Sequence, residues 1–290
     1  MYFGVVVILI AASFWGLGGV CGQFLYEQYG ADAVWLVMDR QFCAGLIFLA
    51  IAWWQGENIW LPLRKDWQDL LKFSFLGVLG CQLGFYYCIS LCNAATATVL
   101  QYLYPAMIML YCAYKERRLP AGREFLGVFM ALLGVFLLAT HGRFDVLQLS
   151  PLVLAVGIGS GVSLAYYTLK PVEMLKKYST CTLVGWGQLL SALPLLCWRN
   201  PFRLPGQWDV LAWCALSFLF LAATVGSYYL YLTGLLRVGP TRAALFCSFE
   251  PVASIISMVV LLGTRLQFVD YVGMSCIIGM VVLLAWPRKV

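Results

Sequence analysis

The sequence predicts an all-α polytopic membrane protein, with ten transmembrane helices arranged as two inverted five-helix repeats and with the N- and C-termini in the cytoplasm. Three observations predict this fold. The 290 residues are 62% hydrophobic and only 11% charged, with a mean hydropathy of +0.85, whereas about a quarter of the residues of a soluble domain are charged. Long apolar blocks recur along the chain, and the basic residues gather in alternate connections.

The apolar blocks define the elements. A block of about 20 residues can cross a hydrocarbon core of about 30 Å as a helix. The alternation typical of membrane strands is missing from these blocks, and lipid admits only helices or closed barrels. The first block has no basic leading region and exceeds a signal-peptide core in length, so we expect it to be retained. The ten expected helices are 3–25, 31–54, 69–90, 94–113, 122–140, 150–170, 180–198, 208–233, 240–262 and 267–286.

The basic residues predict the orientation, because Lys and Arg accumulate in short cytoplasmic connections. With the N-terminus inside, 14 of the 19 lie on the cytoplasmic side, four lie outside, and Arg40 lies within a span. The formal charge of +6 therefore reflects membrane topology. It gives no reason to expect a nucleic-acid partner.

A repeat divides the chain into residues 1–145 and 146–290. Pro105 and Pro251 lie 146 residues apart in the fourth and ninth spans, and the same shift superimposes Gly80 on Gly226. Each half has five crossings, an odd number, so the second half enters the membrane from the opposite side. Inverted repeats place a site near the bilayer midplane, and rocking of one half against the other opens it to alternate sides. The sequence therefore predicts a carrier.

Several function classes are excluded or disfavoured. The polar connections are too short for a soluble domain, and the phosphate-binding GxxxxGK[ST] loop of ATP hydrolysis is missing from the sequence. A gradient would have to drive any pumping. The 11 cysteines form no CxxC motif and His141 is the single histidine, so we expect no metal site and no cofactor. An enzyme acting on lipid would need clustered acids or a nucleophile with its base, so we expect no enzyme.

Short motifs occur in a characteristic order. They are Phe14-Trp15-Gly16, Asn93-Ala94-Ala95-Thr96, Tyr104-Pro105, Glu116, Gly127, Gly239, Glu250-Pro251 and Gly273. In these motifs the chain resembles the ten-helix drug/metabolite transporter superfamily, and within it the EamA-type carriers, over nearly its whole length. The resemblance implies export or exchange of small metabolites through a cavity formed mainly by helices one, three, four, six, eight and nine. Where the family often repeats the glutamate that Glu116 supplies, the second half has Leu262-Gly263-Thr264.

Glu250 is the sharpest candidate for a substrate site. It lies about ten residues into the ninth span, near mid-bilayer, where an ionised carboxylate costs several kcal/mol unless it faces water or a partner. It could hold a substrate amine, or take up and release a proton and so couple transport to a proton gradient. The alternative is a structural carboxylate that orients helices.

Two further pairs are assigned structural or gating roles. Pro105 and Pro251 each free a backbone carbonyl, so each helix should bend there, either as a moving hinge or as a static kink. Asp39 and Arg40 are adjacent on the second span and point about 100° apart, so they cannot neutralise each other fully. Arg40 either binds a substrate carboxylate or, as the favoured role, is the counter-charge of a carboxylate on a neighbouring helix.

Aromatic residues at mid-span could stack substrates or attract cations, or could fill helix interfaces. Between a third and a half of them are expected to line the path. They are Trp15, Tyr86, Tyr87, Tyr102, Tyr104, Tyr166, Tyr167, Tyr228 and Tyr229. All but Tyr167 are assigned to the substrate site, together with Glu250, Gln82 and Ser248. Glycine pairs at 18 and 22, 80 and 84, and 157 and 161 are GxxxG motifs, which predict close helix packing.

These observations predict a secondary active transporter that exports or exchanges a small organic metabolite, above all an amino acid or related amine, by alternating access. It is expected to act as a monomer, surrounded by membrane lipid, as a multi-pass protein of a bacterial cytoplasmic (inner) membrane. The alternative carrier is a multidrug exporter of lipophilic cations, for which one acid among aromatics suffices. A sensor or a passive channel shares the same composition.

Overall fold

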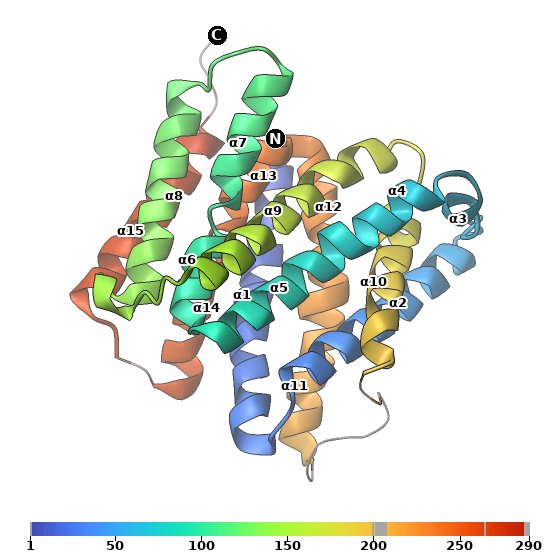
Figure 1. Ribbon diagram of the computed structural model, residues 1–290, viewed down its shortest axis with the longest axis horizontal. Helices are drawn as coiled ribbons and strands as arrows, with labels where there is room; N and C mark the ends of the chain where they lie inside the picture. The colour runs from blue at the N-terminus through green and yellow to red at the C-terminus, as the bar shows by residue number, and fades with distance from the viewer. Residues whose placement is uncertain (1, 199, 201–207, 264, 287–290) are drawn as a thin grey trace.

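The computed structural model describes residues 2–198, 200, 208–263 and 265–286, and over these ranges all regular secondary structure is helical (Figure 1). The α-helices are α1 (Tyr2–Tyr29), α2 (Ala33–Trp54), α3 (Leu61–Lys65), α4 (Trp67–Lys72), α5 (Gly80–Leu91), α6 (Ala94–Gln101), α7 (Tyr104–Lys115), α8 (Gly122–Thr140), α9 (Pro151–Met174), α10 (Thr180–Leu196), α11 (Val210–Phe220), α12 (Ser227–Val238), α13 (Pro240–Cys247), α14 (Glu250–Leu262) and α15 (Phe268–Ala285). Two π-helical segments, η1 (Phe73–Leu79) and η3 (Leu221–Gly226), and a 3₁₀ turn, η2 (Phe144–Val146), complete the chain.

The expected all-helical, multi-pass membrane architecture is confirmed. Eight helical stretches in the described ranges are long and apolar enough to cross a membrane. The seventh expected span is the shorter apolar helix α10, and the fourth is divided into α6 and α7. The count of ten spans and the cytoplasmic position of both termini stay predictions.

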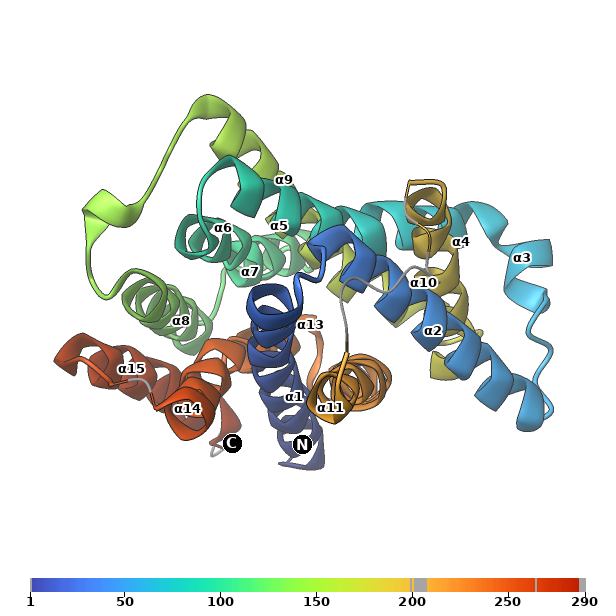
Figure 2. The ribbon, with the colours of Figure 1, turned by 90° about the horizontal axis from the view of Figure 1, so that it is seen from below.

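The helices of the two halves pack against one another in reciprocal pairs. Helix α1 contacts α12 and α14, and α9, its counterpart in the second half, contacts α5, α6 and α7. The pairs α2 with α10 and α8 with α15 each join corresponding helices and lie at opposite ends of the molecule (Figures 1 and 2). Exchanging the halves therefore maps these main contacts onto one another, which is the pattern a duplicated fold produces. The division at residue 145 stays a prediction.

The bends expected at Pro105 and Pro251 are full breaks. Helix α6 ends at Gln101 and α7 begins at Tyr104, with Pro105 in its first turn. Likewise α13 ends at Cys247 and α14 begins at Glu250, with Pro251 in its first turn. Proline lacks the N–H that a continuing helix needs but fits the first turn of a new one. The fourth and ninth spans are thus each two short helices with a non-helical step between them.

The third and eighth spans contain π-helical turns that the sequence patterns did not predict. Segment η1 precedes Gly80 and segment η3 ends at Gly226, so the two occupy corresponding places in the halves. In η3 the hydroxyl of Thr224 donates to the carbonyl of Leu219, five residues back, at 2.6 Å. π-Helical turns are rare and concentrate at functional sites.

The glycine motifs pack closely, with one exception. A Cβ atom added at Gly18 would lie 2.5 Å from the Cβ of Ala223, and one at Gly80 would lie 2.6 Å from the Oγ of Ser163. The positions at 84, 157 and 161 are also occupied by neighbours. Gly22 has no atom within 4 Å of the corresponding point, so the prediction of close packing is wrong there. Of the two glycines in this motif, only Gly18 packs closely against a neighbouring segment.

Asp66 joins the connection between α3 and α4 to the one between α9 and α10. Its carboxylate accepts hydrogen bonds from the Tyr178 hydroxyl at 2.5 Å and from the Lys177 ammonium at 3.1 Å. These two donors, Tyr178 first, lower the pKa of the Asp66 carboxyl below its usual value. The charged form is therefore the one that the folded state favours.

We expect Asp66→Asn to lower the melting temperature at pH 7, and the difference from the unaltered protein to shrink as the pH falls below about 4. The sign follows from the lowered pKa, since the stabilisation is present above the unfolded-state value and is lost as the pH falls through the folded-state value. Thermal unfolding in detergent across that range measures it. A difference that stays constant from pH 7 to pH 3 would contradict the assignment.

Candidate functional site

A central cavity of about 580 Å³ lies between the two halves. Its walls come mainly from α1, α5, α6, α9, α12 and α14, which are the helices one, three, four, six, eight and nine that the resemblance implies. Segment η3, residues of α7, α8, α11 and α13, single side chains of α2 and α15, and residues of the connections complete the lining. The cavity is much larger than one water molecule and lies within the range of small-molecule sites.

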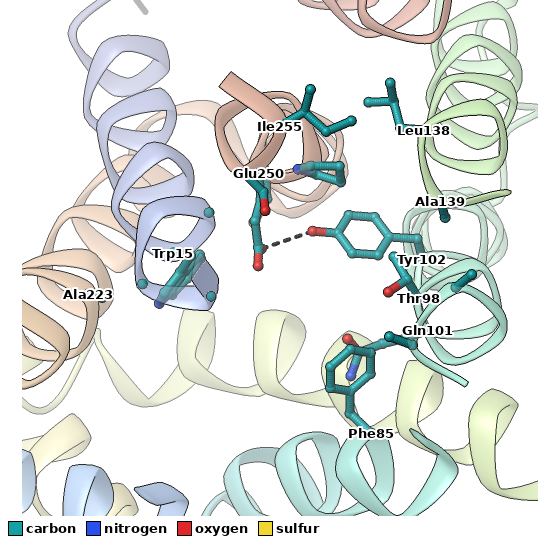
Figure 3. Close-up of a pocket in the computed structure, with 18 of the residues that line it drawn as sticks. Trp15, Phe85, Thr98, Gln101, Tyr102, Leu138, Ala139, Ala223, Glu250 and Ile255 are labelled. Carbon is teal, nitrogen blue, oxygen red and sulfur yellow. Dashed lines mark hydrogen bonds between the residues drawn. The ribbon is translucent and has the colours of Figure 1, made fainter. Parts of the chain in front are cut away.

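Glu250 and Tyr102 bring the two helix breaks together across this cavity. Glu250 is the first residue of α14, and Tyr102 lies in the step between α6 and α7. The Tyr102 hydroxyl donates to the Glu250 carboxylate at 2.9 Å (Figure 3). The positive end of the α14 dipole also favours a negative charge at this position. The half-buried carboxylate points into the space between Tyr102 and Trp15 (Figure 3).

Arg40 also lines the cavity, while its neighbour Asp39 does not. The Arg40 Nε donates to the Thr224 hydroxyl at 3.1 Å, and that hydroxyl in turn is bound to the widened turn of η3. Asp39 is only 8% exposed. Successive helical residues diverge by about 100°, which explains why one of this pair faces the cavity and the other does not.

Aromatic and amide groups form the wall opposite the breaks. The Trp15 ring packs against the rings of Tyr228 and Tyr231, with centroids 5.4 Å apart in both pairs. The Gln82 side chain donates to the Tyr228 hydroxyl at 2.7 Å. Gln82 and Tyr228 are 146 residues apart, which is the shift of the repeat. Corresponding positions of the two halves therefore meet at this bond.

The cavity is closed at one end by packed aromatic side chains. Tyr167, which lines the cavity, stacks on Phe73 with ring centroids 5.6 Å apart and lies parallel to Tyr231 at 6.3 Å. The Tyr104 hydroxyl donates to the Ala244 carbonyl at 3.0 Å and so links α7 to α13. Phe73 and Tyr104 are almost completely buried. The other end of the cavity reaches His141 and Arg265, in connections between helices.

Three predicted substrate tyrosines lie elsewhere. Tyr87 and Tyr229 are 51% and 46% exposed and belong to the outside of the bundle, and Tyr166 lines a second cavity between α7 and α9. The neighbours of these three in the sequence, Tyr86, Tyr228 and Tyr167, line the central cavity instead. Because adjacent helical residues point about 100° apart, only one member of each Tyr-Tyr pair can face the same space. The sequence located the pairs but could not choose the member.

Two other assigned residues, Ser248 and Pro105, also lie outside the cavity lining. Ser248 is fully buried at the end of α13, where its hydroxyl faces the Ala244 carbonyl at 3.5 Å. Pro105 is buried in the first turn of α7, whereas Pro251 lines the cavity. The remaining predicted substrate residues, Trp15, Tyr86, Tyr102, Tyr104, Tyr228, Gln82 and Glu250, all belong to the lining.

The sequence interpretation missed the residues at the cavity entrance. The His141 Nδ1 lies 2.6 Å from the Oδ1 of Asp270, a side chain that is 2% exposed, so this contact joins the end of α8 to the start of α15. Arg265 lines the same entrance. Asp270 also accepts the backbone N–H of Gln267 at 2.8 Å and so caps α15. The sequence does show a single histidine and an acidic residue near the ends of two spans. Because these residues are 129 positions apart, their contact could not be predicted from their spacing.

We expect Tyr102→Phe to raise the KM for transport about tenfold, because it removes the hydroxyl that donates to Glu250. A hydrogen bond to a charged group is worth about 1.5–3 kcal/mol, and 1.4 kcal/mol corresponds to a factor of about ten. Uptake kinetics in proteoliposomes measure the change. Tyr111→Phe, on the far side of α7 and outside the central cavity, is the matched control. Equal kinetics in the two variants would contradict this role of Tyr102.

Comparison with solved structures agrees with this fold. One solved crystal structure superimposes with a TM-score of 0.79, and the alignment covers 97% of this chain and 96% of the other at 19% sequence identity. Identity this low is evidence of a shared fold alone.

Comparison of sequences identifies the family. The model of the EamA-like transporter family matches residues 2–140 and again residues 151–286. The chain is 35% identical to the uncharacterized inner membrane transporter YicL of Salmonella typhimurium, over 99% of this chain and 96% of that one. It is 24% identical to the uncharacterized transporter YetK of Bacillus subtilis, over 99% and 88%. The chain therefore belongs to the EamA-like transporter family and is a multi-pass membrane transporter.

Proposed function

We propose that the protein is a secondary active transporter that exports or exchanges a small organic metabolite, above all an amino acid or related amine, by alternating access. It acts as a monomer in a bacterial cytoplasmic membrane and performs no enzymatic reaction. The observation that carries the proposal is the Glu250 carboxylate, which stands at a helix break in the wall of the central cavity. A carboxylate at membrane depth is costly unless it serves binding or proton transfer.

The shape of the cavity supports alternating access. It is open toward the connections that hold His141 and Arg265 and closed at the other end by Tyr104 and the rings stacked on Tyr167. With the N-terminus inside, the open end is the outer one. Broken helices at the interface of two halves are the elements on which transporters bind substrates and coupling ions. An outward-open cavity is the state from which an exporter releases its substrate.

The multidrug exporter of lipophilic cations is the second candidate. The aromatic rings of Trp15, Phe85 and Tyr86, which line the cavity together with the Glu250 carboxylate, favour it, because such rings attract cations. The two candidates differ in the ligands that stabilise the folded protein. A ligand bound only by the folded state raises the melting temperature, so a thermal-shift screen of amino acids against cationic dyes distinguishes them.

Counterflow tests the proposal as a whole. Proteoliposomes are loaded with unlabelled metabolite and diluted into a trace of the labelled compound. A carrier concentrates the label transiently without any ion gradient, and we expect this overshoot for the ligands found by thermal shift. A passive channel equilibrates the label without overshoot, so simple equilibration would overturn the proposal.

A further inference from the structure

Arg40 lies in the wall of the central cavity and forms no ion pair with a described carboxylate, whereas Arg265, the other arginine of the lining, is exposed at the entrance. Arg40 lines the cavity, and its observed hydrogen bond goes to the neutral hydroxyl of Thr224. All 13 aspartates and glutamates of the chain lie in the described ranges, and none is within 4 Å of a nitrogen of Arg40. The predicted role of Arg40 as counter-charge to a carboxylate on a neighbouring helix stays a prediction, because no ion pair is formed within the described ranges although the positive charge of Arg40 acts on Glu250.

Glu250, in the wall of the same cavity, also lacks an ion pair with a described residue. The Glu250 carboxylate accepts a hydrogen bond from Tyr102, and among the residues that the structure describes it forms no ion pair with a lysine, arginine or histidine. A charge at membrane depth is expensive when unpaired, and such residues mark substrate paths. Arg40 and Glu250 are two opposite charges that line one cavity without a direct ion pair, so one ligand with both charges can pair with each of them.

The Glu250 backbone and segment η3, which binds Arg40, both touch α1. A Cβ atom at Gly16 would lie 2.6 Å from the Glu250 carbonyl oxygen, and one at Gly18 would lie 2.5 Å from Ala223, the neighbour of Thr224. Gly16 and Gly18 are two positions apart, so they differ by about 3 Å in height along the axis of α1. The side of α1 between these two contacts is the one that carries Trp15. Trp15 lines the cavity. The Glu250 backbone and the Arg40-binding segment η3 therefore contact α1 at similar heights, on either side of the position of Trp15.

We propose that the cavity binds a small zwitterion, a molecule with one ammonium and one carboxylate, such as an α- or ω-amino acid. Glu250 receives the ammonium and Arg40 receives the carboxylate, while Trp15 packs against the carbon atoms between or beside them. Arginine suits this role because its guanidinium presents several N–H donors in a plane. The inference rests on the proposed transport function and narrows its substrate class. A cation without a carboxylate would leave Arg40 uncompensated, so the site disfavours the cargo of a multidrug exporter.

The test uses purified full-length protein and matched sets of ligands. The proteinogenic α-amino acids and γ-aminobutyrate are each compared with the amine that lacks the carboxylate and the acid that lacks the ammonium, first by thermal shift and then by counterflow. We expect at least one zwitterion to bind about tenfold or more tightly than both of its analogues, since each lost charge-assisted hydrogen bond is worth about 1.5–3 kcal/mol. In Arg40→Gln this preference over the amine should vanish, and in Glu250→Gln the preference over the acid should vanish.

Three controls and two contrary results complete the design. Arg40→Lys keeps the positive charge and should retain part of the preference. Arg143→Gln and Glu27→Gln, on exposed residues outside the cavity, should retain all of it. If an amine moves by counterflow as well as its zwitterion and Arg40→Gln changes neither, the zwitterion inference is overturned while the carrier stands. If no compound of the panel shows counterflow, the proposed function itself is overturned for this substrate class.

Discussion

Glu250→Gln is expected to abolish or strongly weaken transport while the protein remains folded. The substitution keeps the size of the side chain and its capacity to accept from Tyr102, but it removes the negative charge from the cavity wall. Binding of an ammonium to a buried carboxylate is lost with that charge, at a cost of about 2–5 kcal/mol for a truncated charge pair. Such a loss corresponds to a reduction in affinity of about thirtyfold or more.

Two transport assays separate the two roles open to Glu250. If the carboxylate holds the substrate, Glu250→Gln loses both counterflow and uptake driven by a proton gradient. If it carries a proton instead, counterflow survives, because exchange needs no net proton movement, and only gradient-driven uptake is lost. Glu27→Gln, on an exposed residue of α1, is the control and should match the unaltered protein in both assays. Unchanged rates for Glu250→Gln in both assays would remove this residue from the mechanism.

Gly16→Ala is expected to lower both stability and transport, because Gly16 is where α1 touches the backbone of α14. The added Cβ would lie 2.6 Å from the Glu250 carbonyl oxygen and 2.7 Å from the Ser254 nitrogen. Backbone atoms cannot swing aside as a side-chain tip can, so α14 has to move. Overpacking of this kind costs about 1–3 kcal/mol. The displaced helix begins at Glu250. We therefore expect transport per folded protein to fall as well as the amount of folded protein.

Gly22→Ala is the matched control for that substitution. Gly22 lies on the same helix, yet a Cβ there would have no neighbour within 4 Å. Alanine is also the better helix former by about 1 kcal/mol, so this variant should be as stable as the unaltered protein or more so. The comparison requires melting temperatures in detergent and initial uptake rates per folded protein. Equal behaviour of the two alanine variants would show that the α1–α14 contact does not position Glu250.

The sequence predicted the elements of this fold well because each depends on local composition. The apolar blocks match the helices to within a few residues at most boundaries, and the two prolines marked the broken spans. The π-helical turns at η1 and η3 were not predicted, since they depend on how Thr224 and its neighbours bond within a packed bundle rather than on a pattern of apolar residues.

The candidate site was predicted less completely, for geometric reasons. Glu250, Trp15 and Tyr102 were recognised because a charge or a large ring in an apolar span is conspicuous. The choice between Tyr86 and Tyr87 depends on the rotation of a helix, which the surrounding sequence leaves open when both residues are alike. Arg40 was assigned a structural role because its helix is peripheral in the family pattern, and only the packing of α2 against η3 brings its side chain to the cavity.

The bond between Gln82 and Tyr228 joins positions that correspond in the two halves, so it lies at the place where an axis relating the halves would pass. A rocking motion that exchanges the shapes of the halves moves the ends of the helices most and changes distances across its own axis least. This bond is therefore expected to keep its 2.7 Å length in both the outward-open and the inward-open state, while the Tyr104–Ala244 bond at the closed end has to break. Gln82 and Tyr228 therefore provide a fixed reference position, from which spectroscopic distances to other parts of the molecule can be measured through the transport cycle.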